Sequence, residues 1–206
     1  MIYDPTEKPF TETHKLMIGS IVPRPIAFVS TISKDGNNNV APFSYFNGVC
    51  SNPPTVMFAP ARRGWDGKEK DTLTNIRDNN EFVINMVSES FAEKMVKCST
   101  DFDPNIDEFE ISGLTPESSN KVLPPRVKES KISLECKLDQ IIEIGSGEAG
   151  SGFVVIGTVV LFHIDDDIYE NGHILLDKFE PLGRLAGNWY TRPTDKIKIT
   201  RQVKPK

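Results

Sequence analysis

The residues best suited to chemistry precede a short predicted helix. Residues 67–72, GKEKDT, come before an amphipathic stretch with apolar residues at Leu73 and Ile76. The first N–H groups of a helix lack partners within the helix and attract anions. The ammonium of Lys70 and the hydroxyl of Thr72 would add donors to such an anion site. The alternative is that Thr72 is an ordinary N-cap and Lys70 a solvated surface charge.

A second set of polar residues lies in residues 24–48, RPIAFVSTISKDGNNNVAPFSYFNG. The first part alternates in the manner of a β-strand, and Asp35-Gly36 with the asparagines after it predicts a tight turn. Ser30 and Thr31, near the end of this strand, would add hydroxyl donors to an anion site if they are not simply strand residues. Asn39 begins the return arm of the hairpin.

The return arm, residues 40–47, contains one proline and three aromatic rings. Proline has no N–H to donate to a central strand. Pro42 therefore predicts an edge strand, a bulge, or backbone that faces something other than a strand. Small polar side chains are crowded between the rings, and the arm alone does not say what they face.

The rest of the chain predicts mainly β-structure. Alternation and β-branched residues predict strands at residues 55–59, 81–87, 131–144, 152–165 and 195–200. Short helices are predicted near residues 72–79, capped by Thr72, and 88–97, capped by Ser88 or Ser90. Strands joined by short loops suggest a β-barrel with a few peripheral helices. Residues 98–130, rich in Asp, Pro, Ser and Asn, are expected to cross the surface without regular structure.

Length and composition narrow the class of protein. The chain of 206 residues fits a single domain spanning residues 1–206. A net charge of -5 argues against binding to nucleic acid, and no apolar run reaches the roughly 20 residues of a membrane helix. The first ten residues lack the basic and apolar parts of a signal peptide, so we expect a cytoplasmic protein. Three cysteines and three histidines are widely scattered, so we expect neither a disulfide framework nor a metal site.

Residues 145–150, GSGEAG, match the G-x-G-x-x-G pattern of dinucleotide-binding folds. In those folds the glycines open a helix whose N-terminus receives the pyrophosphate. Here the residues that follow, FVVIGTVVLF at 153–162, are typical of a strand. We therefore interpret the glycines as a hairpin loop between two long strands. As loop residues outside any required left-handed turn, Gly147 and Gly150 are expected to tolerate replacement.

Several spaced motifs resemble a known family. In chain order they are PRPIAFVST, DG, NVAPFSYFNGV, NPP, TVMF, KDTLTNI, EFVINMV and EPLGRLAGNWY. Together they resemble the flavin reductase-like family of FMN-binding split-barrel proteins. That family includes flavoredoxin and the reductase components of two-component monooxygenases, such as nitrilotriacetate monooxygenase component B. This chain has Ala186 where the family's late motif usually has Gly, and residues 103–126 cannot be mapped onto the family.

The resemblance implies a mainly β fold, a split β-barrel, that forms a homodimer with FMN at or near the dimer interface. It implies that the return arm of the hairpin runs along the flavin ring. It also places two pairs, Ser30 with Thr31 and Lys70 with Thr72, near the phosphate, and the late motif over the cofactor. The residues implied in FMN binding are Ser30, Thr31, Asn39, Ala41, Pro42, Phe43, Ser44, Tyr45, Phe46, Lys70, Thr72, Arg184, Trp189 and Tyr190.

Three functions are compatible with that resemblance. Because the flavin itself accepts hydride from a nicotinamide, no catalytic acid or base of the Ser-His-Asp kind is expected. The first hypothesis is an NAD(P)H-dependent flavin reductase that supplies reduced flavin to a partner monooxygenase. The second is a flavoredoxin-type electron carrier with tightly bound FMN. The third is a non-catalytic flavin-binding or storage protein on the same fold.

Overall fold

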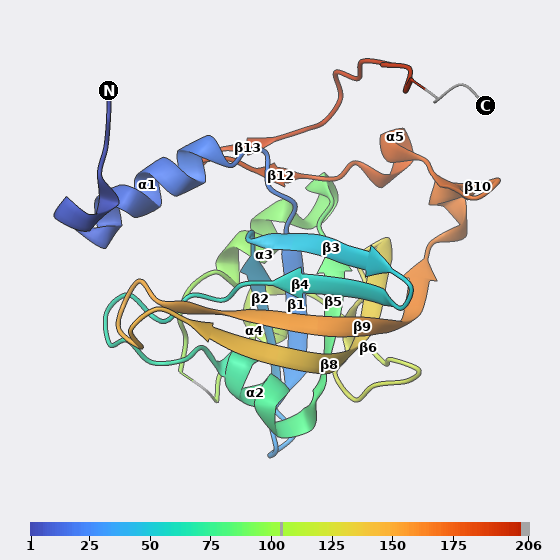
Figure 1. Cartoon of the computed structure of the whole chain (residues 1–206). Coiled ribbons are helices and arrows are strands. Elements are labelled where there is room, and N and C mark those ends of the chain that lie inside the picture. The colour runs from blue at the N-terminus through green and yellow to red at the C-terminus, as the bar shows by residue number, and fades with distance from the viewer. Residues whose placement is uncertain (104, 203–206) are drawn as a thin grey trace.

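One antiparallel sheet of seven strands organises the molecule (Figure 1). The structure, a computed structural model, describes residues 1–103 and 105–202. The strands follow one another across the sheet in the order β2-β1-β5-β8-β9-β4-β3. Their bounds are β1 Ala27–Ile32, β2 Asn38–Phe43, β3 Phe46–Ser51, β4 Pro54–Phe58, β5 Glu81–Met86, β8 Ile132–Ile144 and β9 Gly152–Ile164.

Short elements surround this sheet. Three two-stranded ladders pair β6 Pro116–Glu117 with β7 Arg126–Val127, β10 Tyr169–Glu170 with β11 His173–Ile174, and β12 Gly183–Arg184 with β13 Tyr190–Thr191. The α-helices are α1 Phe10–Ser20, α2 Asp71–Asn79, α3 Ala92–Lys97, α4 Glu108–Ser112 and α5 Leu176–Phe179. Single 3-10 turns occur at η1 Pro5–Glu7, η2 Glu89–Phe91 and η3 Asp166–Ile168. The prediction of a mainly β fold with a few short helices is therefore confirmed.

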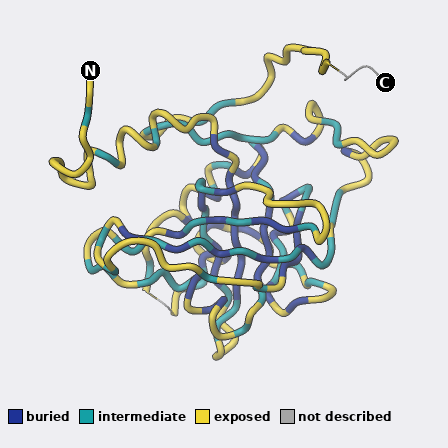
Figure 2. The backbone as a smooth tube through the Cα atoms, in the orientation of Figure 1, coloured by how far each residue is buried: buried dark blue, intermediate teal, exposed yellow. Residues whose placement is uncertain are grey.

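Strand β1 is buried on both faces because it lies between two hydrophobic cores (Figure 2). Successive side chains of a strand point to opposite faces. Ala27 and Val29 join one core, which contains the aromatic chain Phe43, Phe58 and Phe82 and the apolar side of α2. Ile26 and Phe28 join the other core, which α3 and α4 cover with Phe91, Met95 and Phe109. These two cores fix β1, and through it the neighbouring edge strand β2.

The return arm expected to run through residues 40–47 breaks into two strands. Strand β2 ends at Phe43, and Phe46 opens β3, which pairs with β4 on the opposite edge of the sheet. Phe43 and Phe46 both enter the same core. Residues three apart in a continuous strand face opposite sides, so the chain must turn between them at Ser44 and Tyr45. Pro42 lies in the edge strand β2, so the structure selects the edge strand among the three alternatives that this proline left open.

The other predicted strands and helices are mostly confirmed. Strands β4, β5, β8 and β9 and helices α2 and α3 lie where the sequence predicts them. The predicted strand at residues 195–200 is wrong, because this segment forms no strand and pairs with none among residues 1–103 and 105–202, and it leaves Ile197 and Ile199 exposed at 81% each. Residues 98–130 were expected to lack regular structure but contain α4, β6 and β7. Helix α1 was not predicted, and it buries none of its residues, so it carries no packed apolar face.

The glycine-rich segment at residues 145–150 is the hairpin loop between β8 and β9, as expected. The expectation that its glycines avoid left-handed backbone is wrong. Gly145, Gly147 and Gly150 have φ values of +99°, +86° and +93°. A Cβ on Gly150 would also lie 2.7 Å from Cδ2 of Phe10, so a larger residue here would have to displace the Phe10 ring as well as adopt a left-handed conformation.

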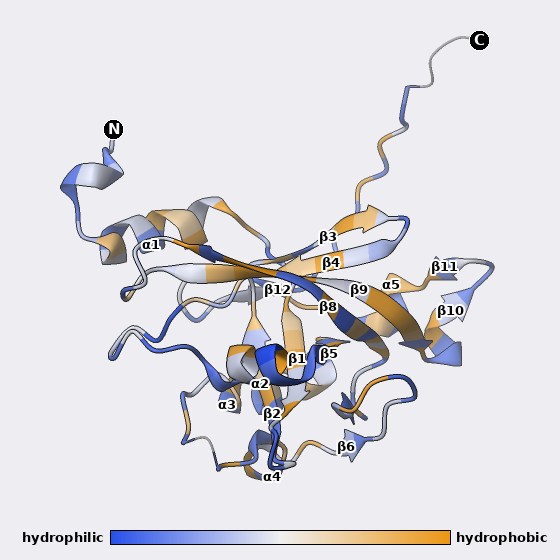
Figure 3. Cartoon of the chain, turned by 60° about the horizontal axis from the view of Figure 1, so that its bottom comes forward, coloured by the Kyte–Doolittle hydropathy of each residue, from blue (hydrophilic) through white to orange (hydrophobic). Residues whose placement is uncertain are grey.

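Helix α1 and the tail after β13, residues 192–202, extend away from the sheet (Figure 1) and carry apolar residues (Figure 3). On α1 and just after it, Phe10, Met17 and Ile21 are 51%, 44% and 49% exposed. Within residues 1–103 and 105–202, no helix combines the length and apolar character needed to cross a membrane.

Candidate functional site

Two cavities meet beside the edge strand β2, where both are lined by Pro42 and Ser99. We name them together the β2 groove. Its charged half is lined by Asn39, Ala41, Pro42, Phe43, Arg63, Lys70, Asp71, Thr72, Cys98, Ser99, Thr100, Asp101, Phe102 and Glu108. Its apolar half, the roomier of the two, is lined by Ile26, Pro42, Ser44, Met95, Val96, Ser99, Arg184, Asn188 and Tyr190.

The charged half is built around the start of helix α2. Lys70 occupies the N-cap position, and the helix begins at Asp71 without a side-chain cap. The prediction that Thr72 caps this helix is therefore wrong, since Thr72 lies inside the first turn. An N-terminus without a cap leaves backbone N–H groups that an anion can satisfy.

Thr72 instead connects α2 to the edge strand. The side-chain amide Nδ2 of Asn39 donates a hydrogen bond to Thr72 Oγ1 at 3.3 Å. A hydroxyl that accepts such a bond can still donate its own hydrogen. Asn39 and Thr72 therefore hold β2 against the first turn of the helix and keep one donor at the wall of the groove.

Each cation of the charged half faces a carboxylate. The Lys70 ammonium contacts the carboxylate of Asp101 directly, and Arg63 Nη2 lies 3.2 Å from Asp71 Oδ1. Burial raises the pKa of Asp71, and the nearby Arg63 guanidinium partly offsets that effect. The half therefore contains two close ion pairs and little net charge.

Glu108 adds a carboxyl group whose charge depends on pH near neutrality. Its side chain is almost fully buried, and the backbone N–H of Val40 donates to Glu108 Oε2 at 3.1 Å. Burial raises the pKa of Glu108 to about 7. Burial likewise raises the pKa of the neighbouring Cys98 thiol to about 11, so Cys98 is not a thiolate at neutral pH.

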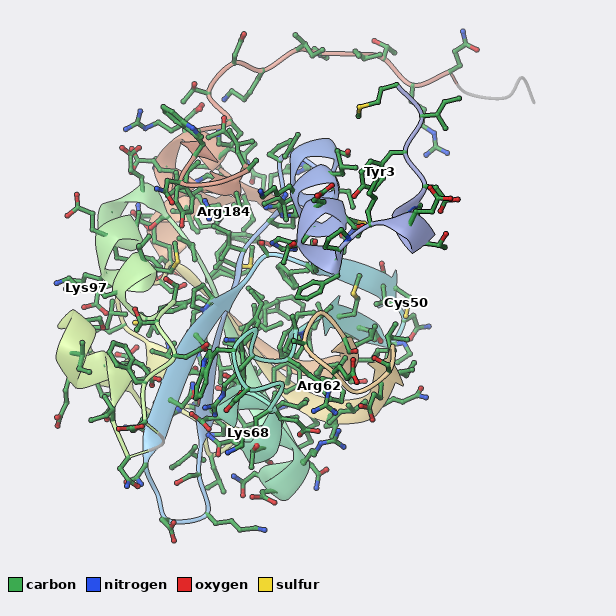
Figure 4. The ribbon with its side chains drawn as sticks, turned by 90° about the vertical axis from the view of Figure 1, so that its left-hand side faces the viewer. Tyr3, Cys50, Arg62, Lys68, Lys97 and Arg184 are labelled. Carbon is green, nitrogen blue, oxygen red and sulfur yellow. The ribbon has the colours of Figure 1, made fainter. Side chains whose placement is uncertain are left out.

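The apolar half has a different character. Pro42 and Val96 supply its accessible apolar surface, Ile26 and Met95 are almost fully buried, and Arg184 is the charged residue among those lining it. The Arg184 guanidinium lies over the ring of Tyr190, with Cζ 4.6 Å from the ring centroid. Figure 4 shows Arg184 between α1 and α3, while Lys68 lies towards α2 at the other end of this side of the molecule.

Arg24, which the sequence reasoning did not select, positions the segments around the apolar half. It is 4% exposed, and its Nη1 donates to the carbonyls of Ile18 and Ile21 at 2.7 and 2.6 Å. Nη2 donates to the carbonyl of Leu185 at 3.0 Å, and Nε donates to Ser44 Oγ at 3.3 Å. Arg24 thus joins the end of α1, the late motif and the turn after β2. The sequence signal for Arg24 was its position directly before an apolar strand, which predicts burial. A buried arginine needs several hydrogen-bond acceptors and therefore joins several segments.

The β2 groove contains most of the residues that the sequence selected. Nine of them line it: Asn39, Ala41, Pro42, Phe43, Ser44, Lys70, Thr72, Arg184 and Tyr190. Trp189 does not line either half and is 74% exposed, although its carbonyl accepts a hydrogen bond from Arg184 Nη1 at 3.1 Å. The fold therefore brings the selected residues of the hairpin, near residue 40, and those of the late motif, near residue 190, to one groove.

Four selected residues point elsewhere. Ser30 and Thr31 are fully buried, with Ser30 Oγ donating to the Pro125 carbonyl and Thr31 Oγ1 accepting from Asn75 Nδ2 at 3.0 Å. Phe46 packs in the core shared with Phe43. The ring of Tyr45 lies under the guanidinium of Arg24, 5.9 Å from its Cζ.

The sequence reasoning missed one wall of the groove. This wall consists of residues 98–102 and Glu108, from a part of the chain without clear periodicity. Arg63 and Asp71 were also missed, although both are close in sequence to Lys70. Only the tertiary fold places residues 98–102 opposite the start of α2.

Comparisons with known proteins agree with this architecture. The family model of the flavin reductase like domain matches residues 18–185. An uncharacterised protein of Aquifex aeolicus is 44% identical over 187 residues, which cover 90% of this chain and 92% of that protein.

Two crystal structures are similar over nearly the whole chain. Nitrilotriacetate monooxygenase component B from Bacillus cereus superposes with a TM-score of 0.92 at 36% identity, covering 97% of this chain and 98% of that one. The 2-nitrobenzoate 2-nitroreductase NbaA from Pseudomonas fluorescens superposes with a TM-score of 0.87 at 33% identity, covering 98% and 96%. The fold is the split barrel expected from the motifs. On the extent of the family match and these similarities, the chain belongs to the flavin reductase-like family.

Proposed function

We propose that this protein is an FMN-binding oxidoreductase that uses NAD(P)H to reduce flavin and supplies the reduced flavin to a partner monooxygenase. The observation that carries this proposal is the β2 groove. Its charged half contains Lys70 and a helix N-terminus without a side-chain cap, and its apolar half contains one guanidinium, that of Arg184. A flavin mononucleotide has the matching parts, a phosphate at one end and a flat aromatic ring at the other.

The charged half fits the phosphate. Lys70 supplies an ammonium, Thr72 a hydroxyl, and the first turn of α2 its backbone N–H groups. Asn39 orients the Thr72 hydroxyl by donating to its oxygen. Ser30 and Thr31 do not line the charged half, because both are fully buried and their hydroxyls bond within the protein, Ser30 to the Pro125 carbonyl and Thr31 to Asn75 of α2.

The apolar half fits the flavin ring. Pro42 and Val96 offer accessible apolar surface on which a flat ring can pack, and Ser44 adds a small polar group. The bound flavin would supply the redox chemistry by accepting hydride and passing electrons on. Arg184 would place positive charge beside the ring, where it favours the reduced, more negative form.

We also propose that two copies of the chain associate. Helix α1 and the tail carry exposed apolar residues, among them Met17, Ile21 and Ile197, and β3 is an edge strand whose residues 47–51 are exposed. Burial of such surface between two copies would remove apolar area from water. Sedimentation equilibrium of the purified protein tests this point, and a monomer at micromolar concentration would contradict it.

Steady-state oxidation of NADH and NADPH with added FMN, FAD or riboflavin tests the proposed activity. A flavin reductase should turn over with a rate that saturates in added flavin. A flavoredoxin-type carrier would instead retain its flavin through purification and gain nothing from free flavin. A protein that binds flavin without oxidising either nicotinamide would contradict the enzyme assignment and support the storage alternative.

A further inference from the structure

We propose that Asp101 is an affinity-setting residue of the β2 groove, which competes with the phosphate of the ligand for the ammonium of Lys70. The inference rests on the proposed function, because it takes FMN as the ligand of the charged half. It assigns a role to a residue that neither the motifs nor the proposed function uses.

The contact between the two residues crosses the charged half. Lys70 comes from the loop before α2, and Asp101 comes from residues 98–102, which form the opposite wall. The two side chains are 27% and 29% exposed, so their ion pair is partly shielded from water. It is therefore less screened than a pair on the open surface.

Lys70 supplies the one ammonium among the described residues that line the charged half. Arg63 lies against Asp71. Burial raises the pKa of Asp71, the Arg63 guanidinium lowers it in part, and the nearby Asp101 carboxylate raises it further. A phosphate that binds Lys70 must therefore either share the ammonium with Asp101 or displace it. Two anions at one ammonium repel each other, so displacement is favoured.

The position of Asp101 in the fold permits such a displacement. Residues 98–102 connect α3 to the segment before α4 and lie outside the seven-stranded sheet. A connecting segment can shift without breaking the ladder hydrogen bonds that hold β2 and β1.

The consequence is a selective penalty on phosphate-bearing flavins. FMN must break the contact between Asp101 and Lys70, whereas riboflavin has no phosphate and leaves it intact. Asp101 would thus keep FMN exchangeable. Exchange suits a protein that delivers reduced flavin to a partner better than one that retains it.

Titration of flavin fluorescence against the full-length protein tests the role of Asp101. Asp101→Asn keeps the shape of the side chain and removes its charge. The Kd for FMN should fall about fivefold or more, while the Kd for riboflavin stays within about twofold. Asp177→Asn is the matched control, because Asp177 pairs with Lys196 at 2.6 Å outside the β2 groove and its replacement changes the net charge equally. This control should leave both constants unchanged.

A second variant separates competition from a general charge effect. In Lys70→Met the ammonium is absent. Asp101→Asn should therefore increase FMN affinity much less in the Lys70→Met background than in the wild-type protein. If the wild-type protein prefers FMN but Asp101→Asn binds FMN equally or more weakly, Asp101 orients Lys70 and the inference is wrong while the proposed function stands. If the wild-type protein shows no preference for FMN over riboflavin, the proposed phosphate site fails, and this inference fails with it.

Discussion

Asn39 and Thr72 connect the edge strand β2 to the first turn of α2 through a hydrogen bond of 3.3 Å between Nδ2 and Oγ1. Both residues are nearly buried, at 7% and 1% exposure. The bond therefore fixes the distance between the return arm of the hairpin and the N-terminus of the helix. These are the two elements between which the proposed phosphate site lies.

Thr72→Val should weaken both the fold and FMN binding. Valine keeps the shape of threonine but leaves the buried Asn39 amide without its acceptor, which costs about 1–3 kcal/mol in the free energy of unfolding. Thr72→Ser retains the hydroxyl and should restore most of both properties. Urea denaturation and FMN titration of the two variants measure the effect. Identical FMN affinity in Thr72→Val and the wild-type protein would remove Thr72 from the proposed site.

Glu108 should make stability fall as pH rises towards neutrality. Burial raises the pKa of Glu108 from an ordinary 4.5 to about 7 in the folded protein. Between these values the folded state keeps a proton that the unfolded state releases, so the free energy of unfolding decreases with increasing pH. Glu108→Gln removes this contribution, and its oxygen can still accept from the N–H of Val40.

Urea denaturation at pH 5 and pH 8 measures this effect. The decrease in the free energy of unfolding between the two pH values should be about 1–3 kcal/mol smaller for Glu108→Gln than for the wild-type protein. Glu110→Gln, on the exposed side of the same helix, is the control and should follow the wild-type curve. Parallel pH curves for wild type and Glu108→Gln would show that Glu108 titrates normally.

Gly157→Ala should destabilise the barrel core. A Cβ at Gly157 would lie 2.5 Å from Cζ of Phe82 and 3.0 Å from the carbonyl oxygen of Lys137. The ring of Phe82 packs edge-on against Phe58 and has little room to shift, so overpacking should cost about 1–3 kcal/mol. Gly48→Ala in β3 is the matched control, because its Cβ would meet nothing within 4 Å. Equal thermal midpoints for the two variants would contradict the packing described for this core.

Gly147→Ala should affect stability and leave the chemistry intact. The φ of +86° at Gly147 costs an alanine roughly 1–2 kcal/mol. As a hairpin loop, however, residues 145–150 should not contact the nicotinamide, so kinetics with NAD(P)H and FMN affinity should stay within about threefold. A selective loss of NAD(P)H turnover, with fold and FMN binding retained, would mean that the glycines form a dinucleotide site after all.

The sequence predicted the fold where local pattern and tertiary pairing agree. The polar and apolar residues of β8 alternate, β9 is rich in β-branched residues, and the two long strands pair with each other across one loop, so their pattern was sufficient. The break after Phe43 was missed because Ser44 and Tyr45 are compatible with a strand, and only the shared core of Phe43 and Phe46 requires the turn. Polar and apolar residues alternate equally well along residues 195–200, but within the described part of the chain this segment pairs with no strand.

The site was predictable to the extent that its residues are close in sequence to a motif. Lys70, Thr72 and Pro42 lie in such motifs, and the fold brings them to one groove. Ser30 and Thr31 belong to the same motifs, yet their strand is covered on both faces and their hydroxyls turn inward. Asp101 lies after α3 and Glu108 is the first residue of α4, and their place at the groove depends on tertiary packing that no local pattern records.

The most direct test compares FMN with riboflavin by isothermal titration of the wild-type protein and Lys70→Ala. If the charged half of the β2 groove holds the phosphate, FMN should bind at least about tenfold more tightly than riboflavin, a difference of about 1.4 kcal/mol. Lys70→Ala should remove most of that preference and leave riboflavin binding nearly unchanged. Equal affinities of the wild-type protein for the two flavins, or a preference for FMN that persists in Lys70→Ala, would contradict the placement of the phosphate at Lys70.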